Sequence, residues 1–212
     1  MKSNDNFNFI ENLVKRYPEL SVCRPKIEKA VAAILDVYSS GGKILLCGNG
    51  GSAADCEHIA GELLKGFITK RTPESHELMG LTLALGSESC AKKLQRGIPA
   101  IPLPSITGAV SAFANDVDPE LVYAQLVFSL GKNSDLLVCL STSGNSKNVV
   151  NAARVAKALG IKTLALTGES GGELKKICDI TITAPECETY KIQEYHLPIY
   201  HAICAEAERI LF

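Results

Sequence analysis

Five short apolar runs, each separated from the next by a segment of helical pattern, constrain the fold of this chain more than any other feature. The runs cover residues 43–47, 98–103, 136–140, 162–166 and 179–183. Most of them are nearly continuous in Val, Ile and Leu, which indicates strands that are buried on both faces. Helices between such strands, with right-handed crossovers, produce a parallel sheet. We therefore predict a doubly wound α/β domain with a five-stranded parallel sheet and helices on both faces, a flavodoxin-like three-layer sandwich.

Helical periodicity fills the intervals between the strands. Two amphipathic helices, near residues 8–16 and 26–39, precede the core within an N-terminal part that spans residues 1–41. Further helices are predicted at 53–65, 105–114, 119–130, 146–159, 172–177 and 189–210. Two prolines in the 98–103 run suit a strand at the edge of the sheet. Residues 68–97 do not follow the alternation, and such an excursion is typical of an insertion, a lid or a subunit contact within one domain over 1–212.

Composition and charge exclude several classes of protein. The 212 residues are 46% hydrophobic, enough to bury a full core, so a disordered chain is excluded. A formal net charge of −1 with scattered Lys and Arg provides no basic stripe for nucleic acid and no polybasic membrane anchor. Residues 1–7 lack the pattern of a signal peptide, so we expect a cytoplasmic location. The eight cysteines contain no Cys-x-x-Cys spacing and are interpreted as reduced core residues rather than as metal or redox sites.

Two loops rich in glycine and hydroxyl groups follow predicted strands directly. One contains Ser141, Thr142, Ser143 and Ser146, and the other contains Asn49, Gly50, Gly51 and Ser52. Hydroxyl donors, backbone N–H groups and a helix N-terminus at one point suit a phosphate group, although Ser and Asn are also ordinary helix caps. In parallel α/β sheets the ligand lies outside the carboxyl ends of the strands, where both loops can converge. The sequence therefore favours a phosphorylated small molecule as ligand.

Histidine and carboxylate side chains share one helix face beside the first loop. His58 and Glu62 are four residues apart, a spacing that suits a metal site, an acid–base pair or an ordinary surface pair. The last helix carries Gln193, His196 and His201. Gln193 and His201 are separated by about 12 Å on a straight helix, so one ion reaches both only through extended side chains or a neighbouring subunit. His196 is left open as a structural or a supporting residue.

These motifs together resemble the sugar isomerase (SIS) domain family. The resemblance rests on residues 47–55, on the segment from His58 to Leu63, on the 141–146 turn, and on residues 192–196 with His201. Within the family, the chain is most similar to the phosphoheptose isomerases, the enzymes of sedoheptulose 7-phosphate. Four separated motifs occur in the expected order over most of the chain.

The resemblance implies an activity and a set of site residues. The activity is the conversion of sedoheptulose 7-phosphate to D-glycero-D-manno-heptose 7-phosphate through an enediol, by a homotetramer whose active sites lie at subunit contacts. The implied acid–base pair is Glu62 and His201. The positions that match the zinc ligands of the family are His58, Glu62, Gln193 and His201. Those that match its substrate-binding residues are Asn49, Gly50, Gly51, Ser52, Glu62, Asn115, Asp116, Ser141, Thr142, Ser143, Ser146 and Gln193.

Other readings of the same motifs stay open. Some SIS proteins are non-catalytic, either as sugar-phosphate sensors or as tetramers that bind a replication initiator, and an isomerase of another sugar phosphate is a third possibility. The presence of both Glu62 and His201 favours an enzyme. The chain also departs from its better-known relatives, which place a basic residue near the substrate just after the Glu62 helix. Lys65, Lys70 and Arg71 are the candidates here.

Overall fold

The computed structural model describes residues 8–212, so the prediction for residues 1–7 lies outside the described residues. A parallel sheet of five strands forms the centre, in the order β2-β1-β3-β4-β5. The strands are β1 (Ile44–Cys47), β2 (Ala100–Pro102), β3 (Leu136–Leu140), β4 (Lys162–Thr167) and β5 (Ile180–Thr183). β2 contains Pro102, with Pro99 just before it, and lies at an edge of the sheet as predicted. The order, with β1 inside the sheet, is that of a doubly wound fold and confirms the predicted fold class.

The two faces of the sheet support separate cores. Ile44 and Leu46 of β1 belong to one core, whereas Leu45 and Cys47 belong to the other, because successive side chains of a strand point to opposite faces. The first core includes α1 (Phe9–Arg16), the short helix η1 (Pro18–Cys23), α2 (Arg24–Ser39), α3 (Gly51–Leu64) and α10 (Thr189–Leu211). The second includes η2 (Leu103–Ser105), α6 (Thr107–Asp116), α7 (Val122–Leu130), α8 (Lys147–Ala158) and α9 (Leu174–Ile177), while the short helix η3 (Pro119–Leu121) precedes α7 without a buried residue.

Helices α3 and α10 pack side by side, and the order of their contacts shows that they run in the same direction. Their contacts follow one another in parallel order. Gln193 lies against Gly51 near the start of both helices, and His201 lies beside His58 farther along. The pairing places side chains from two segments about 140 residues apart in sequence on one shared seam.

A buried ion pair fixes the far end of this seam. Arg71 Nε donates to Glu208 Oε1 of α10 at 2.7 Å, and both side chains are almost fully buried. Glu208 also accepts the backbone N–H groups of Phe67, Ile68 and Thr69. Burial alone would raise the pKa of Glu208, but these donors and the Arg71 guanidinium lower the pKa below its ordinary value. The ion pair therefore holds the segment that follows α3 against α10.

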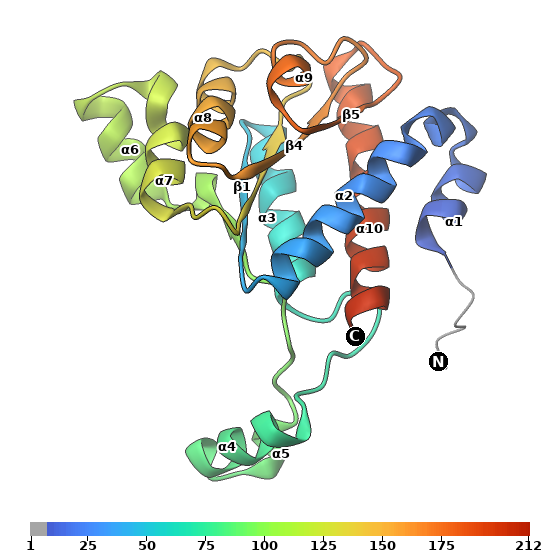
Figure 1. Ribbon diagram of the computed structural model, residues 1–212, viewed down its shortest axis with the longest axis vertical. Coiled ribbons are helices and arrows are strands. Elements are labelled where there is room, and N and C mark those ends of the chain that lie inside the picture. Colours follow the sequence, from blue (N-terminus) through green and yellow to red (C-terminus); the bar gives the residue numbers. More distant parts are fainter. Residues whose placement is uncertain (1–7) are drawn as a thin grey trace.

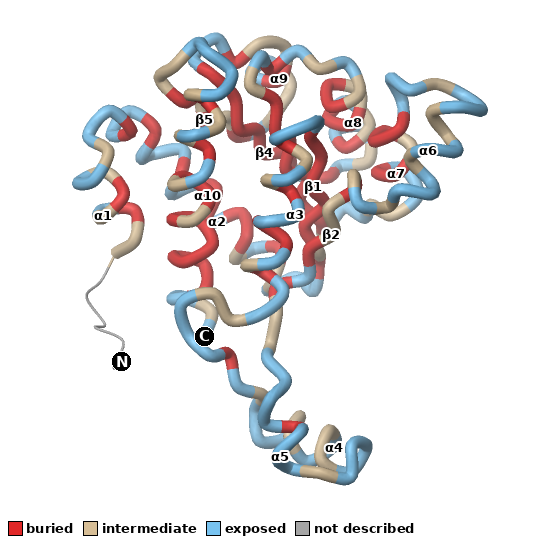
Figure 2. Tube along the Cα trace, turned by 180° about the vertical axis from the view of Figure 1, so that it is seen from behind, coloured by how far each residue is buried: buried red, intermediate tan, exposed pale blue. Residues whose placement is uncertain are grey.

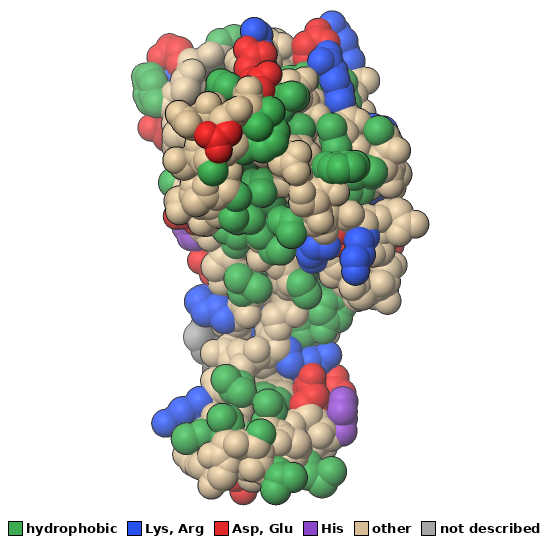
Figure 3. Space-filling view, turned by 90° about the vertical axis from the view of Figure 1, so that its left-hand side faces the viewer, with side chains coloured by type: hydrophobic (Ala, Val, Ile, Leu, Met, Phe, Trp, Pro, Cys, Tyr) green, Lys and Arg blue, Asp and Glu red, His purple; other side chains and the backbone are tan. Residues whose placement is uncertain are grey.

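Residues 68–97 form an arm that projects from the body (Figure 1). The arm contains α4 (Ser75–Leu85) and α5 (Glu88–Ala91), which pack on each other. No residue of α4 is buried, and the arm is mostly exposed in Figure 2. Met79 and Leu83 are 76% and 86% exposed, and Figure 3 shows hydrophobic side chains over the surface of the arm. The arm lies at the opposite end of the molecule from the 141–146 turn in Figure 1.

Some predicted elements differ in the structure. The single helix expected at 119–130 is divided into η3 and α7, and the helix expected from Gly172 begins at Leu174 because Gly171 and Gly172 have positive φ. The interpretation of all eight cysteines as core residues is wrong for Cys90 and Cys187, which are exposed on the arm and on a loop; all eight are free thiols. Within residues 8–212, no helix is long and apolar enough to cross a membrane.

Candidate active site

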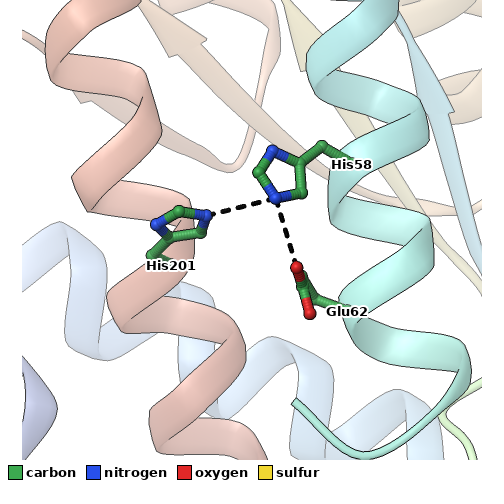
Figure 4. Close-up of side chains that lie close together, drawn as sticks. All are labelled: His58, Glu62 and His201. Atoms are coloured by element: carbon green, nitrogen blue, oxygen red, sulfur yellow. Dashed lines mark hydrogen bonds and ion pairs between the residues drawn. The ribbon is translucent and has the colours of Figure 1, made fainter. Parts of the chain in front are cut away.

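Three side chains converge between α3 and α10 (Figure 4). His58 Nε2 lies 3.2 Å from Glu62 Oε1 and 3.4 Å from His201 Nε2. One potential ligand atom from each of the three residues falls within 4.8 Å of the others. The first pair results from the four-residue spacing on α3, which places both side chains on one helix face. The third member is supplied by the parallel neighbour α10.

The spacing and chemistry of this cluster fit a zinc ion. Two ligand atoms about 2.0–2.1 Å from a tetrahedral ion lie about 3.3 Å apart, close to the two short distances in the cluster. Two imidazoles and one carboxylate are a donor set of catalytic zinc sites, which leave a fourth position open. The second oxygen of Glu62, Oε2, is buried and accepts no hydrogen bond from the described residues. A cation would satisfy this carboxylate.

The electrostatics keep one imidazole available as a ligand or base. Burial lowers the pKa of His201 below its ordinary value, and His58 lowers it further, while Glu62 acts in the opposite direction. A neutral imidazole at neutral pH retains a lone pair on one ring nitrogen. The side chain of His58 is 43% exposed and that of Glu62 is 15% exposed, so the cluster is open to solvent on one side.

Gln193 lies at the other end of the seam. A Cβ built on Gly51 would be 2.5 Å from Gln193 Nε2, so the amide occupies the space that a side chain at position 51 would need. The His58, Glu62 and His201 cluster lies two turns farther along α3. Gln193 is therefore placed beside the first loop, and its assignment as a metal ligand stays a prediction.

His196 is a structural residue of α10. The side chain is fully buried, and its Nε2 lies 3.2 Å from the carbonyl oxygen of Thr167 in β4. Burial lowers the pKa of His196 to about 4. The imidazole is neutral at neutral pH and packs between α10 and the sheet, which resolves the open reading of this residue.

The 141–146 turn gathers hydroxyl groups at the start of α8. Ser141 and Ser146 hydroxyls hydrogen-bond each other at 3.0 Å, and Gly144 has a φ of +67° with the space for a Cβ filled by the Gly171 carbonyl. Ser146 does not cap α8 with its side chain. In the first turn of that helix the Val149 N–H donates to Asn148 Oδ1 at 3.0 Å, so the usual capping hydrogen bond is made by a residue inside the helix and not by Ser146. This geometry favours the ligand-binding reading of the turn over the capping reading.

The first loop is joined to the second at the carboxyl ends of the strands. Asn49 exchanges two hydrogen bonds of 2.9 Å with Asn148 of α8, and Tyr123 also donates to Asn49. Gly50 has a φ of +54°, and α3 begins with no side-chain cap while Ser52 in its first turn is buried. In neither helix does the N-cap residue make a side-chain capping bond, and the two loops before these helices lie beside each other. Asn148 could not be singled out from local patterns, because its partner Asn49 lies 99 residues away in sequence.

Asn115 and Asp116 lie at the exposed end of α6. Asn115 Nδ2 donates to Asp116 Oδ1 at 2.8 Å. The helix packs against α7 and η3, on the opposite core from the His58 cluster. The structure thus does not bring these two residues to the cluster, and their role in substrate binding stays a prediction from the resemblance.

Two of the three basic candidates after α3 have defined contacts, and the third, Lys70, is exposed. Arg71 is buried and donates to the carbonyl oxygens of Glu62 and Leu63, so it supports the end of α3 and does not face a substrate. Lys65 is exposed, and its Nζ lies 3.6 Å from Glu62 Oε2. Lys65 is therefore the basic residue that the structure places beside the cluster.

Sequence reasoning assigned no role to two further residues at the cluster. Tyr200 Oη lies 3.0 Å from His58 Nδ1 and 3.2 Å from Asp55 Oδ1. The only sequence signals for these two residues were their positions, because Asp55 precedes His58 by three residues and Tyr200 precedes His201 by one. Neither spacing shows a contact without the packing of α3 on α10.

Comparisons of the sequence with known proteins show its family. A sequence profile of the SIS domain matches residues 8–98 and 95–168. The chain is 40% identical to the phosphoheptose isomerase of Aliarcobacter butzleri over 84% of its own length and 82% of the relative. It is 38% identical to the phosphoheptose isomerase of Helicobacter pylori over 86% of its own length and 83% of the relative.

Solved structures show the same likeness. The phosphoheptose isomerase of Francisella tularensis has a TM-score of 0.75 and 29% identity, with 93% of each chain covered. That of Neisseria gonorrhoeae has a TM-score of 0.68 and 30% identity, with 93% of this chain and 97% of the other covered.

Proposed function

The chain belongs to the SIS domain family and is similar over most of its length to phosphoheptose isomerases; from this premise we propose that it interconverts sedoheptulose 7-phosphate and D-glycero-D-manno-heptose 7-phosphate. The reaction is an aldose–ketose isomerisation. It moves a proton from C1 to C2 and a second proton between the two oxygens, through an enediol. No redox cofactor is required, because one carbon is oxidised as its neighbour is reduced.

The observation that carries the proposal is the convergence of His58, Glu62 and His201 within 4.8 Å. The two helices that supply these residues begin or pass beside the loops that suit a phosphate group. A carboxylate and an imidazole at one end of a polyhydroxy chain, with an anion site at the other, are what an enediol isomerase needs.

We propose zinc as the ion of this site, held by His58, Glu62 and His201. Gln193 matches a fourth ligand position of the family, and from its place beside Gly51 it would reach the ion only through an extended side chain or from a neighbouring subunit. Bound there, zinc would act as a Lewis acid that polarises the carbonyl group and offsets negative charge on the oxygens. The spacing of the cluster supports this assignment, as does the buried Oε2 of Glu62, which accepts no hydrogen bond from the described residues and has the exposed Lys65 Nζ at 3.6 Å.

The residues of the chain then divide the work. Ser141, Ser143 and Ser146, with the N-terminus of α8, bind the phosphate and fix the distance to the cluster. The Glu62 carboxylate removes a proton from C1 and returns it to C2. His201 exchanges the proton between the oxygens on C1 and C2. The two carbon–hydrogen steps balance, so the enzyme ends in its starting protonation state.

The resemblance further supports a homotetramer of a single SIS domain over 1–212, with residues 68–97 as an insertion. Light scattering on the purified chain tests the assembly. A mass of four chains agrees with the proposal, and a monomer at micromolar concentration contradicts it.

The test of function is direct conversion. The zinc-loaded chain is mixed with sedoheptulose 7-phosphate, and the anomeric proton of the aldose is followed by NMR. We expect the aldose to accumulate with the wild-type chain and not with Glu62→Gln, which keeps the size of the side chain and the phosphate loops. Sugar-phosphate binding by the wild-type chain without conversion, with and without zinc, would refute the isomerase and support the sensor reading.

A further inference from the structure

A hydrogen-bonded chain of three side chains lies behind the metal-facing nitrogen of His58. Tyr200 of α10 is 2% exposed, and its hydroxyl contacts both Asp55 Oδ1 at 3.2 Å and His58 Nδ1 at 3.0 Å. The rings of His58 and Tyr200 meet edge to face at 5.4 Å. The imidazole is therefore held on the side opposite to the cluster that its Nε2 joins.

The direction of these hydrogen bonds follows from the number of hydrogens. A carboxylate only accepts, and the Tyr200 hydroxyl has a single hydrogen to donate. If that hydrogen pointed to His58, Asp55 Oδ1 would face a bare oxygen, and its Oδ2 already has no partner among the described residues. Hydrogen bonds to an ionised acceptor are roughly twice as strong as neutral ones. The hydroxyl therefore donates to Asp55 and accepts from His58 Nδ1–H.

We propose that Tyr200 and Asp55 are positioning residues that hold His58 with its hydrogen on Nδ1, so that the lone pair of Nε2 is presented to the ion. The inference rests on the metal site of the proposed function. Ligand histidines are usually oriented through their second ring nitrogen, and loss of such a partner typically weakens metal binding by roughly 10- to 100-fold.

Zinc affinity tests the inference. The full chain is stripped of metal by dialysis against a chelator, and its zinc affinity is measured by competition with a chromogenic chelator. We expect Tyr200→Phe to bind zinc at least tenfold more weakly than the wild-type chain. Tyr195→Phe is the matched control, because this tyrosine lies on the same helix and donates to Glu19, away from the cluster; its affinity should stay within twofold.

A second variant tests the direction of the hydrogen bonds from His58 to Tyr200 and from Tyr200 to Asp55. Asp55→Ala removes the acceptor of the Tyr200 hydrogen and leaves the hydroxyl free to donate to Nδ1. That donation places the imidazole hydrogen on Nε2, where it competes with zinc, so the affinity should again fall at least tenfold although Tyr200 is intact. This variant also keeps the inference testable if Tyr200→Phe does not fold.

A spectroscopic readout separates positioning from a general loss of structure. In the zinc-loaded wild-type chain, the Nδ1–H of His58 should appear in proton NMR as a slowly exchanging signal with a contact to the Tyr200 ring. A rapidly exchanging Nδ1–H, or zinc affinities of the variants within threefold of the wild-type value, would overturn the positioning role of Tyr200 and Asp55. Neither result would contradict the metal site. A wild-type chain that binds no zinc would instead refute the metal site itself, and with it the positioning role of Tyr200 and Asp55.

Discussion

Acid sensitivity of folding should depend on one buried histidine that does not belong to the active site. His196 is fully buried with its Nδ1 unpartnered among the described residues, and burial lowers its pKa from 6.5 to about 4. In the unfolded chain the imidazole takes up a proton near its ordinary pKa. Between the two values the unfolded state binds more protons than the folded state, so the free energy of unfolding falls as the pH falls.

The magnitude follows from the size of the shift. Each pKa unit corresponds to about 1.36 kcal/mol, so the loss attributable to His196 is roughly 2 kcal/mol at pH 5 and roughly 3 kcal/mol at pH 4. The stabilisation is fully present above the unfolded pKa. In a protein of ordinary marginal stability, such a loss is a large part of the total.

The assay is urea-induced unfolding, followed by circular dichroism at pH 7 and at pH 5. Wild-type chain and His196→Gln are compared, because glutamine does not titrate and its amide can still donate to the Thr167 carbonyl. Acid effects of every other group are common to both chains and cancel in the difference. We expect the wild-type chain to lose about 2 kcal/mol more than the variant between the two pH values. Parallel losses in the two chains would show that the reasoning about His196 is wrong.

Three further predictions concern the Arg71–Glu208 ion pair, the 141–146 turn and the zinc ion. Arg71→Met leaves the Glu208 carboxylate buried without its cation and should lower the free energy of unfolding by about 3–5 kcal/mol in urea titrations; a loss below 1 kcal/mol would contradict a buried ion pair. Gly144→Ala adds a Cβ 2.2 Å from the Gly171 carbonyl oxygen at a φ of +67°, so it should cost at least about 2 kcal/mol by the same measurement, and an unchanged midpoint would argue against the backbone geometry. Dialysis against a chelator should lower the isomerase rate at least tenfold, and added zinc should restore the rate. An isomerase rate that neither treatment changes would exclude a metal requirement.

Much of the fold could be predicted because the signals are local. β3 was predicted at its observed bounds, since a run of five buried apolar residues is bounded by polar turns on both sides. The edge position of β2 followed from the two prolines of the 98–103 run, of which Pro102 lies in the strand and Pro99 just before it. The same locality explains why His58 and Glu62 were expected on one face of a helix, and why the 141–146 turn was expected to follow a strand.

The arm shows the limit of local signals. The apolar stretch within residues 68–97 is as hydrophobic as a core helix, yet α4 has no buried residue. Periodicity indicates a helix, but burial depends on what the rest of the chain brings to that helix. Arg71 shows the reverse case, because a basic residue in a polar run is buried by a carboxylate about 140 residues away.

The sequence by itself determined the parallel sheet, the two loops and the pair on α3, because strand and helix periods and turn residues act over a few positions. Only the tertiary structure decided which residues of α10 meet that pair. The parallel packing of α10 on α3 brings His201 to His58, places Gln193 at Gly51, and buries Tyr200 between Asp55 and His58. Contacts between such distant segments are set by the shape of the shared core, which no local pattern encodes.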